Sequence, residues 1–358
     1  MSTLKVEIVK IDDIRKHPDA DRLDLVTIKG WQCVAGKDEF KKGDRAVYIP
    51  IDSILSESLE EKLFKNSKIK LNNHRVKSIK IRGAISQGML VSLKTLELEG
   101  KAEGDDVTIL LGITKYEPPV EFIGAAKGQK SIKQSNTYFR KYTDIENFKN
   151  FNDIFKDNEG VSVTEKIHGT NFRCGYVHYD TNTILKKVLK FLGLAPKYEF
   201  VYGSHNIQLQ ENPCEANIYW EIVEKYKLRQ VLKPGEVVYG EIYGDGIQKG
   251  YTYGCQKGVR EIVFFDVMVN GKYLDNYGFR CFFVDRRLPL VPEIYFGPFS
   301  LKIIKDLMKK PSQLSPAQST MEGVVIKPYK EEASRIGRKV LKFINDGYLL
   351  QKDLTEFH

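Results

Sequence analysis

The chain has 358 residues, of which 42% are hydrophobic and 29% are charged, and its formal net charge is +9. This length suits about two domains, and this composition excludes an intrinsically disordered chain. No apolar run is long enough to span a membrane. Most of the excess positive charge lies beyond residue 120, which favours a polyanionic partner there, although a solvated basic surface would explain it equally well.

The cysteines and the first residues bear on the cellular compartment. The five cysteines are Cys33, Cys174, Cys214, Cys255 and Cys281. They are scattered and form no CxxC pair, so we expect neither a zinc site nor a disulfide framework. The N-terminal residues lack the apolar core of a secretory signal. An intracellular location, in the cytoplasm or in a compartment that the sequence does not identify, fits these features best.

The first 118 residues read as short strands separated by turns. The pattern alternates over residues 4–11 and on both sides of Lys29-Gly30, and a further pair of strands follows over residues 77–93. Residues 103–113 would supply the closing strand. Several short strands within about a hundred residues predict a small β-barrel.

The composition changes after this barrel, and strands and helices alternate beyond Tyr138. The Pro-, Gly- and polar-rich residues in between read as a linker. The predicted division is a barrel over residues 1–118, a linker over 119–136 and a second domain over 137–358. Hydrophobic periodicity predicts helices over residues 181–193, 216–228 and 300–312. The first of these helices carries lysines on one side, and we expect its apolar side to pack in the core.

The strand-like run over residues 161–166 ends in a lysine, Lys166. A lysine is an unusual residue at the inner end of a strand. The pattern Lys-x-x-Gly alone says little, because it also begins at Lys80, Lys101 and Lys190. Only Lys166 ends a β-rich run, and its glycine, Gly169, would let the backbone pass close to a bulky ligand. Such a lysine can be an amine nucleophile if its charge is suppressed.

Further chemical groups follow Lys166 along the chain. Glu241 ends a strand and could bind a ribose hydroxyl, Phe265 could stack on a base, and downstream lysines could bind phosphates. Each residue also has an interpretation without any function: Phe265, for example, could be a core residue, which is the more common place for phenylalanine. The positions of Glu322 and Lys327 differ by five, so a regular strand would point them to opposite faces unless a bulge at Gly323 brings them to the same face. Their joint occurrence in this order nevertheless meets the needs of nucleotidyl transfer onto a lysine.

These segments also resemble a known family. The residues 165–172, 240–241, 265–266 and 322–328, followed by Lys342, closely resemble the nucleotidyltransferase motifs of ATP-dependent RNA ligases. In addition, residues 17–53 and 80–91 resemble the N-terminal OB-fold of the Deinococcus/Naegleria type of RNA ligase. The resemblance covers nearly the whole chain.

The resemblance implies an α+β protein, with an OB-fold β-barrel followed by an ATP-grasp-like adenylyltransferase domain of antiparallel sheets with flanking helices. It implies an enzyme that uses ATP and Mg²⁺ or Mn²⁺ and carries AMP on Lys166. This enzyme would seal RNA 3′-hydroxyl and 5′-phosphate ends, at nicks in a duplex, through an RNA-adenylate. We expect a monomer without a membrane partner.

The same resemblance, together with the sequence context, gives the expected site residues. We expect catalytic roles for Lys166, Lys327, Lys342 and Glu322; nucleotide contacts from Glu165, Ile167, Gly169, Asn171, Glu241, Phe265 and Lys339; metal-associated roles for Glu322, Glu241 and His168; and RNA contacts from Lys29, Trp31, Arg82, Arg173 and His205.

Two departures and two alternatives accompany this interpretation. His168 stands where many relatives have Asp, and Lys342 lacks the second lysine of a Lys-x-Lys motif, for which Lys339 would substitute. Capping guanylyltransferases and DNA ligases share the lysine chemistry but usually carry an OB domain after the last lysine motif, where this chain has only residues 343–358. The remaining alternative is an OB-fold RNA-binding protein with an inactive transferase domain.

Overall fold

The computed structural model describes residues 3–65, 70–116, 135–181, 183–209, 217–351 and 354. Its contacts divide the chain into two compact units. Unit 1 comprises Met1–Pro119, Ile145–Asp153 and Asp346–His358, and unit 2 comprises Val120–Asp144 and Ile154–Asn345. Most of the expected linker over residues 119–136, and Cys214, lie outside the described residues. Within the described ranges no helix is long and apolar enough to cross a membrane.

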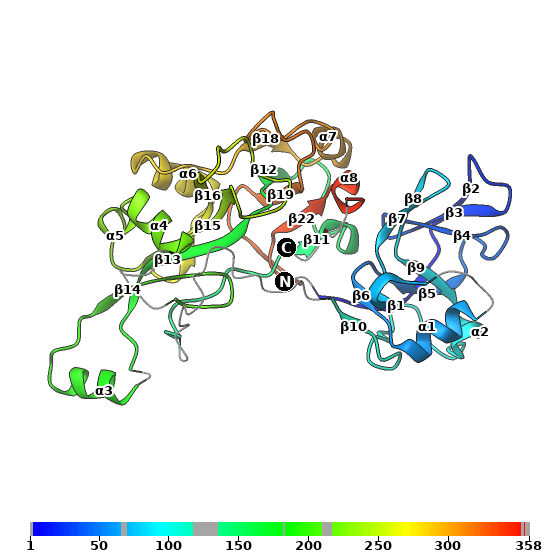
Figure 1. Ribbon diagram of the computed structural model, residues 1–358, viewed down its shortest axis with the longest axis horizontal. Coiled ribbons are helices and arrows are strands. Elements are labelled where there is room, and N and C mark those ends of the chain that lie inside the picture. Colours follow the sequence, from blue (N-terminus) through cyan, green and yellow to red (C-terminus); the bar gives the residue numbers. More distant parts are fainter. Residues whose placement is uncertain are drawn as a thin grey trace. The chain divides into compact units, whose positions relative to one another are not determined.

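Unit 1 is built mainly from short strands (Figure 1). Its elements are β1 (Glu7–Lys10), β2 (Asp13–Lys16), β3 (Leu23–Ile28), β4 (Trp31–Gly36), β5 (Arg45–Ile49), β6 (Ser53–Ile54), α1 (Glu57–Phe64), η1 (Asn72–His74), β7 (Ser78–Ile81), β8 (Ala84–Gln87), β9 (Met89–Ser92), α2 (Leu93–Leu96), β10 (Thr114–Lys115), β11 (Glu146–Asn147), η2 (Phe148–Asn150) and α8 (Asp346–Leu349). The strands pair in the orders β1-β5-β9, β2-β3-β4, β7-β8 and β10-β6.

Local sequence explains the hairpins of unit 1. Lys29 and Gly30 join β3 to β4 with φ values of 46° and 83°, as a two-residue type I′ turn requires. Buried and less buried residues alternate along both strands, so one face of this hairpin lies in the core. The expected closing strand over residues 103–113 is largely wrong. Asp106 forms an isolated bridge with Glu7, turns follow, and pairing resumes only in β10.

Unit 2 contains two larger antiparallel sheets. Its elements are β12 (Gly160–Lys166), β13 (Thr170–His178), α3 (Ile184–Phe191), β14 (Tyr198–Gly203), α4 (Ile218–Lys225), α5 (Leu228–Val231), β15 (Glu236–Gly244), β16 (Arg260–Val269), β17 (Lys272–Tyr273), α6 (Asn276–Asp285), β18 (Glu293–Pro298), α7 (Leu301–Leu307), β19 (Gly323–Pro328), β20 (Ala333–Ser334), β21 (Gly337–Arg338) and β22 (Leu341–Ile344). One sheet contains the order β22-β19-β12-β18, and the other has the order β14-β13-β15-β16-β17.

Two of the three expected helices pack as their periodicity predicts. The helix α4 buries Ile218, Ile222 and Val223 on one face, and α7 ends before Pro311. The third expectation is wrong. The helix α3 forms, but it has no buried residue, because it lies outside the sheets on a hairpin between β13 and β14 (Figure 1).

The expected RNA contact of Trp31 is also wrong, because this side chain is only 1% exposed. Its ring nitrogen donates to Asn150 Oδ1 at 2.8 Å, and the Lys149 ammonium lies 4.4 Å from the ring centre. Trp31, Lys149 and Asn150 all belong to unit 1. The indole therefore holds the segment Ile145–Asp153 against the strands of this unit.

We expect Trp31→Ala to lower the free energy of unfolding of unit 1 by about 3–5 kcal/mol, because it leaves a large cavity and an unpaired amide. Trp31→Phe should cost clearly less, since most of the volume is retained. Urea unfolding, followed by circular dichroism, measures both variants. A weaker affinity of Trp31→Ala for single-stranded RNA without any loss of stability would restore the surface assignment.

Candidate active site

The register of the first sheet places several lysines on one face. Lys166 pairs with Gly323 across β12 and β19, while Val325 pairs with Lys342 across β19 and β22. Directly paired residues share a face, and so do residues two apart on a strand. Lys166, Lys327 and Lys342 therefore lie on the same face of the sheet. The opposite face is buried and mainly apolar, as Val163, Val324 and Ile326 show.

The Lys166 ammonium forms an ion pair with Glu322, with 2.6 Å between Nζ and Oε1. Glu322 is completely buried, whereas the lysine side chain keeps 14% of its exposure. Glu322 stands one residue before β19, so the alternation that would turn it away from Lys327 does not apply to it. Burial raises the pKa of Glu322, and Lys166 and Lys342 oppose this rise. The structure therefore brings Lys166, Glu322 and Lys342 together, as the sequence led us to expect.

A second carboxylate comes from the other sheet. Glu241 of β15 pairs with Asn171 of β13, and the Asn171 Oδ1 is buried without a hydrogen-bond partner among the described residues. Burial raises the pKa of Glu241 to about 8; the Glu322 carboxylate adds to this shift, while Lys166 opposes it. These effects bring Glu241 and Glu322 into one electrostatic cluster with Lys166.

The turn between β12 and β13 passes very close to β15. A Cβ atom on Gly169 would lie 2.1 Å from the Ile242 carbonyl oxygen, so only glycine fits there. Position 169 thus requires glycine because the neighbouring strand β15 passes so close, whereas we expected a bulky ligand to be the reason. In the same turn Ile167 and His168 are buried, and the backbone N–H of His168 donates to the Tyr253 hydroxyl at 2.7 Å.

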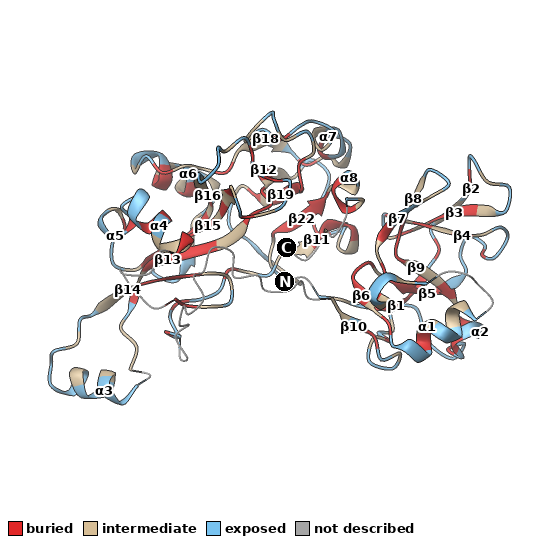
Figure 2. Ribbon diagram, in the orientation of Figure 1, coloured by how far each residue is buried: buried red, intermediate tan, exposed pale blue. Residues whose placement is uncertain are grey.

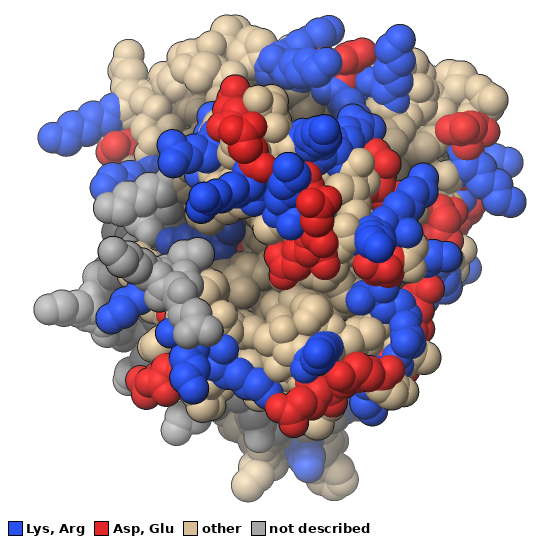
Figure 3. Space-filling model, turned by 90° about the vertical axis from the view of Figure 1, so that its right-hand side faces the viewer, with Lys and Arg blue, Asp and Glu red and all other residues tan. Residues whose placement is uncertain are grey.

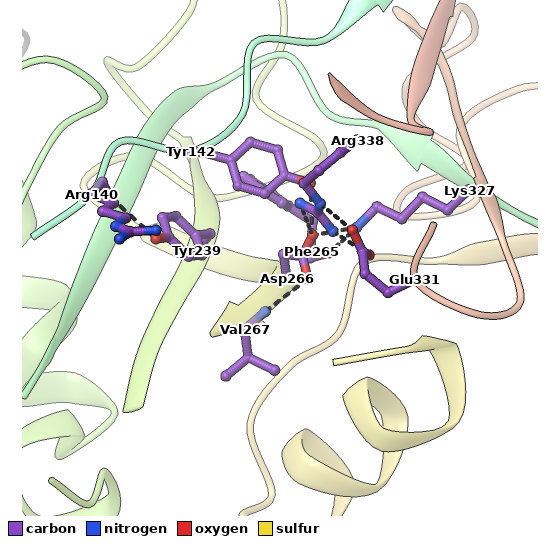
Figure 4. A network of polar contacts seen from close by, with 9 residues as sticks. All are labelled: Arg140, Tyr142, Tyr239, Phe265, Asp266, Val267, Lys327, Glu331 and Arg338. Atoms are coloured by element: carbon purple, nitrogen blue, oxygen red, sulfur yellow. Dashed lines mark hydrogen bonds and ion pairs between the residues drawn. The ribbon is translucent and has the colours of Figure 1, made fainter. Parts of the chain in front are cut away.

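A cluster around Asp266 lies on the second sheet (Figure 4). Lys327 Nζ donates to Asp266 Oδ2 and to the Phe265 carbonyl, both at 2.8 Å. Arg338 and the Tyr142 hydroxyl bind the same Asp266 oxygen at 3.0 and 2.7 Å. Although burial acts in the opposite direction, Lys327 and Arg338 hold the pKa of Asp266 below its usual value. The ammonium of Lys327 is thus paired with Asp266 and the Phe265 carbonyl in this structure.

Sequence reasoning noted Asp266 but missed its partners Tyr142 and Arg338. Their distance along the chain hides them, although an arginine so close to the last motif is a usable hint. Phe265 occupies a β-bulge, since Tyr239 pairs with Asp266 whereas Gly240 pairs with Phe264. Its half-buried ring contacts Tyr142 edge-on, with 4.9 Å between the ring centres.

Two expected nucleotide contacts have other partners. Lys339 forms ion pairs with Glu159 and, at 3.3 Å, with Glu332, so nothing in its contacts places it with Lys166. The Glu165 carboxylate accepts hydrogen bonds from the backbone N–H groups of Gln313 and Leu314 at 2.8 and 3.1 Å. Glu165 therefore anchors a loop through its side chain.

The remaining expected RNA contacts are not brought together. Arg173 is buried and donates to the carbonyls of Phe139 and Ser204, so the surface role expected for it is wrong. Burial lowers the pKa of His205 to about 4, which leaves its imidazole neutral at pH 7. Lys29 pairs with Glu7, and Arg82 is exposed at a hairpin turn. Figure 3 shows one face on which basic side chains are spread out with acidic ones among them.

The donor atoms fit a divalent cation that arrives with a substrate. Glu322 Oε2 is buried without a hydrogen bond from any described residue, and burial raises the pKa of Glu241 more than the nearby Lys166 lowers it. The described residues contain no group of three or more His, Cys, Asp or Glu that could hold a metal. Mg²⁺ commonly binds one or two carboxylates together with substrate phosphates and water. Glu241 and Glu322 suit that mode of binding.

Comparisons with known families agree with this architecture. A family model described as an OB-fold domain matches residues 5–93, and one described as RNA ligase matches residues 159–344. The second match covers more than half of the chain and includes Lys166, Glu241, Glu322 and Lys342. The chain belongs to the RNA ligase family, and the fold and enzyme class expected from the sequence are confirmed.

Solved structures of Naegleria gruberi RNA ligase share the fold at low sequence identity. The structure with PPi has a TM-score of 0.74 and 23% identity, covering 97% of this chain and 98% of that chain. A mutant with ATP and Mn has a TM-score of 0.75 and 23% identity, again covering 97% and 98%. Among curated proteins, the phenylalanine–tRNA ligase beta subunit of Geobacter sulfurreducens is 29% identical over 104 residues. That match spans 28% of this chain and only 11% of the relative's length.

The raised pKa of Glu241 predicts a pH-dependent stability. The unfolded carboxyl ionises near 4.5 and the folded one near 8, so between these values only the unfolded state releases the proton and stability falls as the pH rises. Glu241→Gln removes this cost. We expect it to stabilise the nucleotide-free protein by on the order of 2 kcal/mol at pH 8 and much less at pH 5.

Thermal unfolding of both proteins at several pH values measures this difference. Glu224→Gln, which changes an exposed glutamate on α4, is the matched control and should follow the parent protein. A Glu241→Gln advantage that does not change between pH 5 and pH 8 would show that the carboxyl is ionised in the folded state throughout.

Proposed function

We propose that this protein is an ATP-dependent RNA ligase that carries AMP on Lys166 before passing it to an RNA 5′-phosphate. The observation that carries the proposal is the strand-borne Lys166 amine, partly exposed and held 2.6 Å from the buried Glu322. The titles of solved Naegleria gruberi RNA ligase structures name ATP, AMP, PPi and Mn, which supports the same ligands here.

In the first step the uncharged Lys166 amine attacks the α-phosphorus of ATP. The P–N bond forms, the bond from the α-phosphorus to the bridging oxygen breaks, and pyrophosphate leaves with that electron pair. Glu322 is the base nearest to the amine, and its raised pKa suits it to accept the first proton, which the Lys166 ammonium loses before the attack. The second proton, which the nitrogen loses once the P–N bond has formed, leaves with pyrophosphate or passes to water. Lys342, on the same face of the sheet, supplies a cation for the phosphates.

In the later steps the AMP passes to the RNA 5′-phosphate, and the 3′-hydroxyl displaces it. A bound Mg²⁺ or Mn²⁺ would neutralise phosphate charge in each step, and before the first step it would compete with the Lys166 ammonium for Glu322 and Glu241. Glu241 would then have its charge compensated and could orient the ribose. Asn171, whose buried Oδ1 lacks a hydrogen bond among the described residues, is available for the nucleotide. Phe265 supplies an aromatic ring next to this face.

We further propose that the RNA ends meet at a nick in a duplex and that residues 1–118 contribute mainly to RNA binding. The reacting groups Lys166, Glu241, Glu322 and Lys342 all belong to unit 2, which supports this division of labour. The described cysteines are free, in keeping with work inside the cell.

The first test is covalent labelling. After incubation with ATP and Mg²⁺ or Mn²⁺, we expect intact-mass analysis to show one added AMP per chain, and peptide mapping to place it on Lys166. Lys166→Ala should lower the labelling rate by on the order of 10³-fold or more, because the nucleophile is gone. Lys101→Ala, which changes another Lys-x-x-Gly match, is the matched control and should label normally. An adduct on another residue would refute the assignment, labelling with GTP alone would indicate capping, and the absence of any adduct would favour an RNA-binding protein.

A second test concerns the substrate. A panel of nicked duplexes, in which either strand of the break or the template is RNA or DNA, should be sealed fastest when the 3′-hydroxyl strand is RNA. We expect unannealed RNA ends to be joined at least about tenfold more slowly, because a duplex holds both ends in place. Equal rates on nicked and unannealed ends would contradict the nick preference while leaving the lysine chemistry intact.

A further inference from the structure

The hairpin between β13 and β14 carries the helix α3 away from the sheets of unit 2 (Figure 1). The helix is well terminated: the Thr183 side chain accepts from the Lys186 N–H, and Gly193 follows the helix with φ 69°. Lys186 also pairs with Glu199 at the base of the hairpin, at 2.7 Å. Local contacts thus define both ends of α3, although no core of described residues packs beneath the helix. We call residues 183–194 the α3 arm.

Most residues of the α3 arm are exposed (Figure 2). Phe191 is 90% exposed and Ile184 82%. The exposed large apolar residues of the arm are Ile184, Leu185, Val188, Phe191, Leu192 and Leu194. Isolated exposed apolar residues are ordinary, whereas a contiguous group marks an interaction surface.

The charges of the arm are separated from its apolar side. At about 100° per residue, Ile184, Val188 and Phe191 fall on one face of the helix. Lys186 and Lys190 fall on the opposite face, and Lys187 lies at the edge between the two. The sequence has no acidic residue between Asp180 and Glu199, so the arm is purely cationic.

We propose that the α3 arm binds the surface of an anionic lipid bilayer, with its apolar face at the boundary of the acyl chains. A cationic polar face opposite a Leu- and Phe-rich face is the pattern of helices that lie in a membrane interface. Anionic headgroups complement Lys187 and Lys190, and apolar burial supplies the remaining free energy. The sequence led us to expect no membrane partner, and the exposed face of α3 leads us to revise that expectation.

Other partners fit the arm less well. RNA phosphates would engage its lysines but leave its Leu and Phe side chains in water. A second copy of this chain could offer its own α3 arm, but pairing two arms would bring together two lysine-rich helices that have no acidic residue to compensate them. Elsewhere among the described residues, the large exposed apolar side chains occur singly or in small groups, such as Ile109 with Leu110 or Tyr277 with Val284. The proposal does not depend on the ligase reaction, because none of its residues belongs to the Lys166 cluster.

Vesicle co-sedimentation of the full chain tests the proposal. We expect the bound fraction on vesicles of equal phosphatidylglycerol and phosphatidylcholine to exceed that on phosphatidylcholine alone by about tenfold at low salt. Leu185→Ser with Phe191→Ser should reduce binding at least about fivefold. Lys187→Gln with Lys190→Gln should weaken binding and flatten its salt dependence.

Two matched controls separate the arm from the general basic charge. Lys302→Gln with Lys305→Gln removes two exposed lysines from α7, and Tyr277→Ser with Val284→Ser removes two exposed apolar side chains from α6. Both pairs should bind vesicles like the parent protein. Phe191→Trp gives a second readout, since its fluorescence should shift to shorter wavelength only with anionic vesicles.

Several results would overturn the proposal. Absence of binding to anionic vesicles would do so, as would full binding by the Leu185→Ser, Phe191→Ser protein, which would mean simple adsorption of a basic chain. Loss of duplex-RNA binding in the Lys187→Gln, Lys190→Gln protein, with vesicle binding unchanged, would assign the arm to RNA. A concentration-dependent dimer that the Phe191→Ser change abolishes would assign it to self-association.

Discussion

The ion pair between Lys166 and Glu322 is the interaction on which the site depends. A fully buried carboxylate is costly unless a cation compensates it, and here the cation is also the group that must react. The pair exists because β12 ends at Lys166 directly opposite the start of β19. The register of two adjacent strands thus fixes the distance between the amine and its carboxylate. The lysine can react only when something else compensates Glu322, which couples the chemistry to the arrival of a positively charged ligand or a proton.

The two carboxylate clusters of unit 2 differ in the direction of their pKa shifts. Burial raises the pKa values of Glu241 and Glu322 despite the nearby lysine, whereas Lys327 and Arg338 lower that of Asp266 despite burial. The first cluster is therefore under-compensated and gains from a bound cation. The second is satisfied by protein groups alone, so Lys327 ties its own strand, β19, to β16. This contrast separates a site prepared for a ligand from a contact that joins two sheets.

Local sequence predicted the features that depend on local geometry. The Lys29-Gly30 turn, the strand that ends at Lys166 and the buried face of α4 all follow from spacing and turn chemistry. The partners of Asp266 could not be predicted, because Tyr142 lies 124 residues away from it along the chain and Arg338 lies 72 residues away. Glu322 shows a subtler limit: the sequence grouped it with the lysines, although regular strand alternation would point it away from Lys327. The sequence alone could not show that β19 begins only at Gly323, so that Glu322 is not bound by this alternation.

Trp31 and α3 show why burial is the hardest property to obtain from sequence. An indole beside a hairpin turn suits either a stacking platform or a core anchor, and only the segment Ile145–Asp153, far along the chain, makes it a core residue. The α3 pattern fits a core-packed helix or a surface one equally well, because periodicity defines an apolar face without defining what covers it. In this chain the segment Ile145–Asp153 covers Trp31, whereas α3 extends on its hairpin beyond the sheets that could have covered it. The exposed face of α3 is therefore a consequence of topology. Burying this apolar face against a partner would contribute favourable free energy of binding.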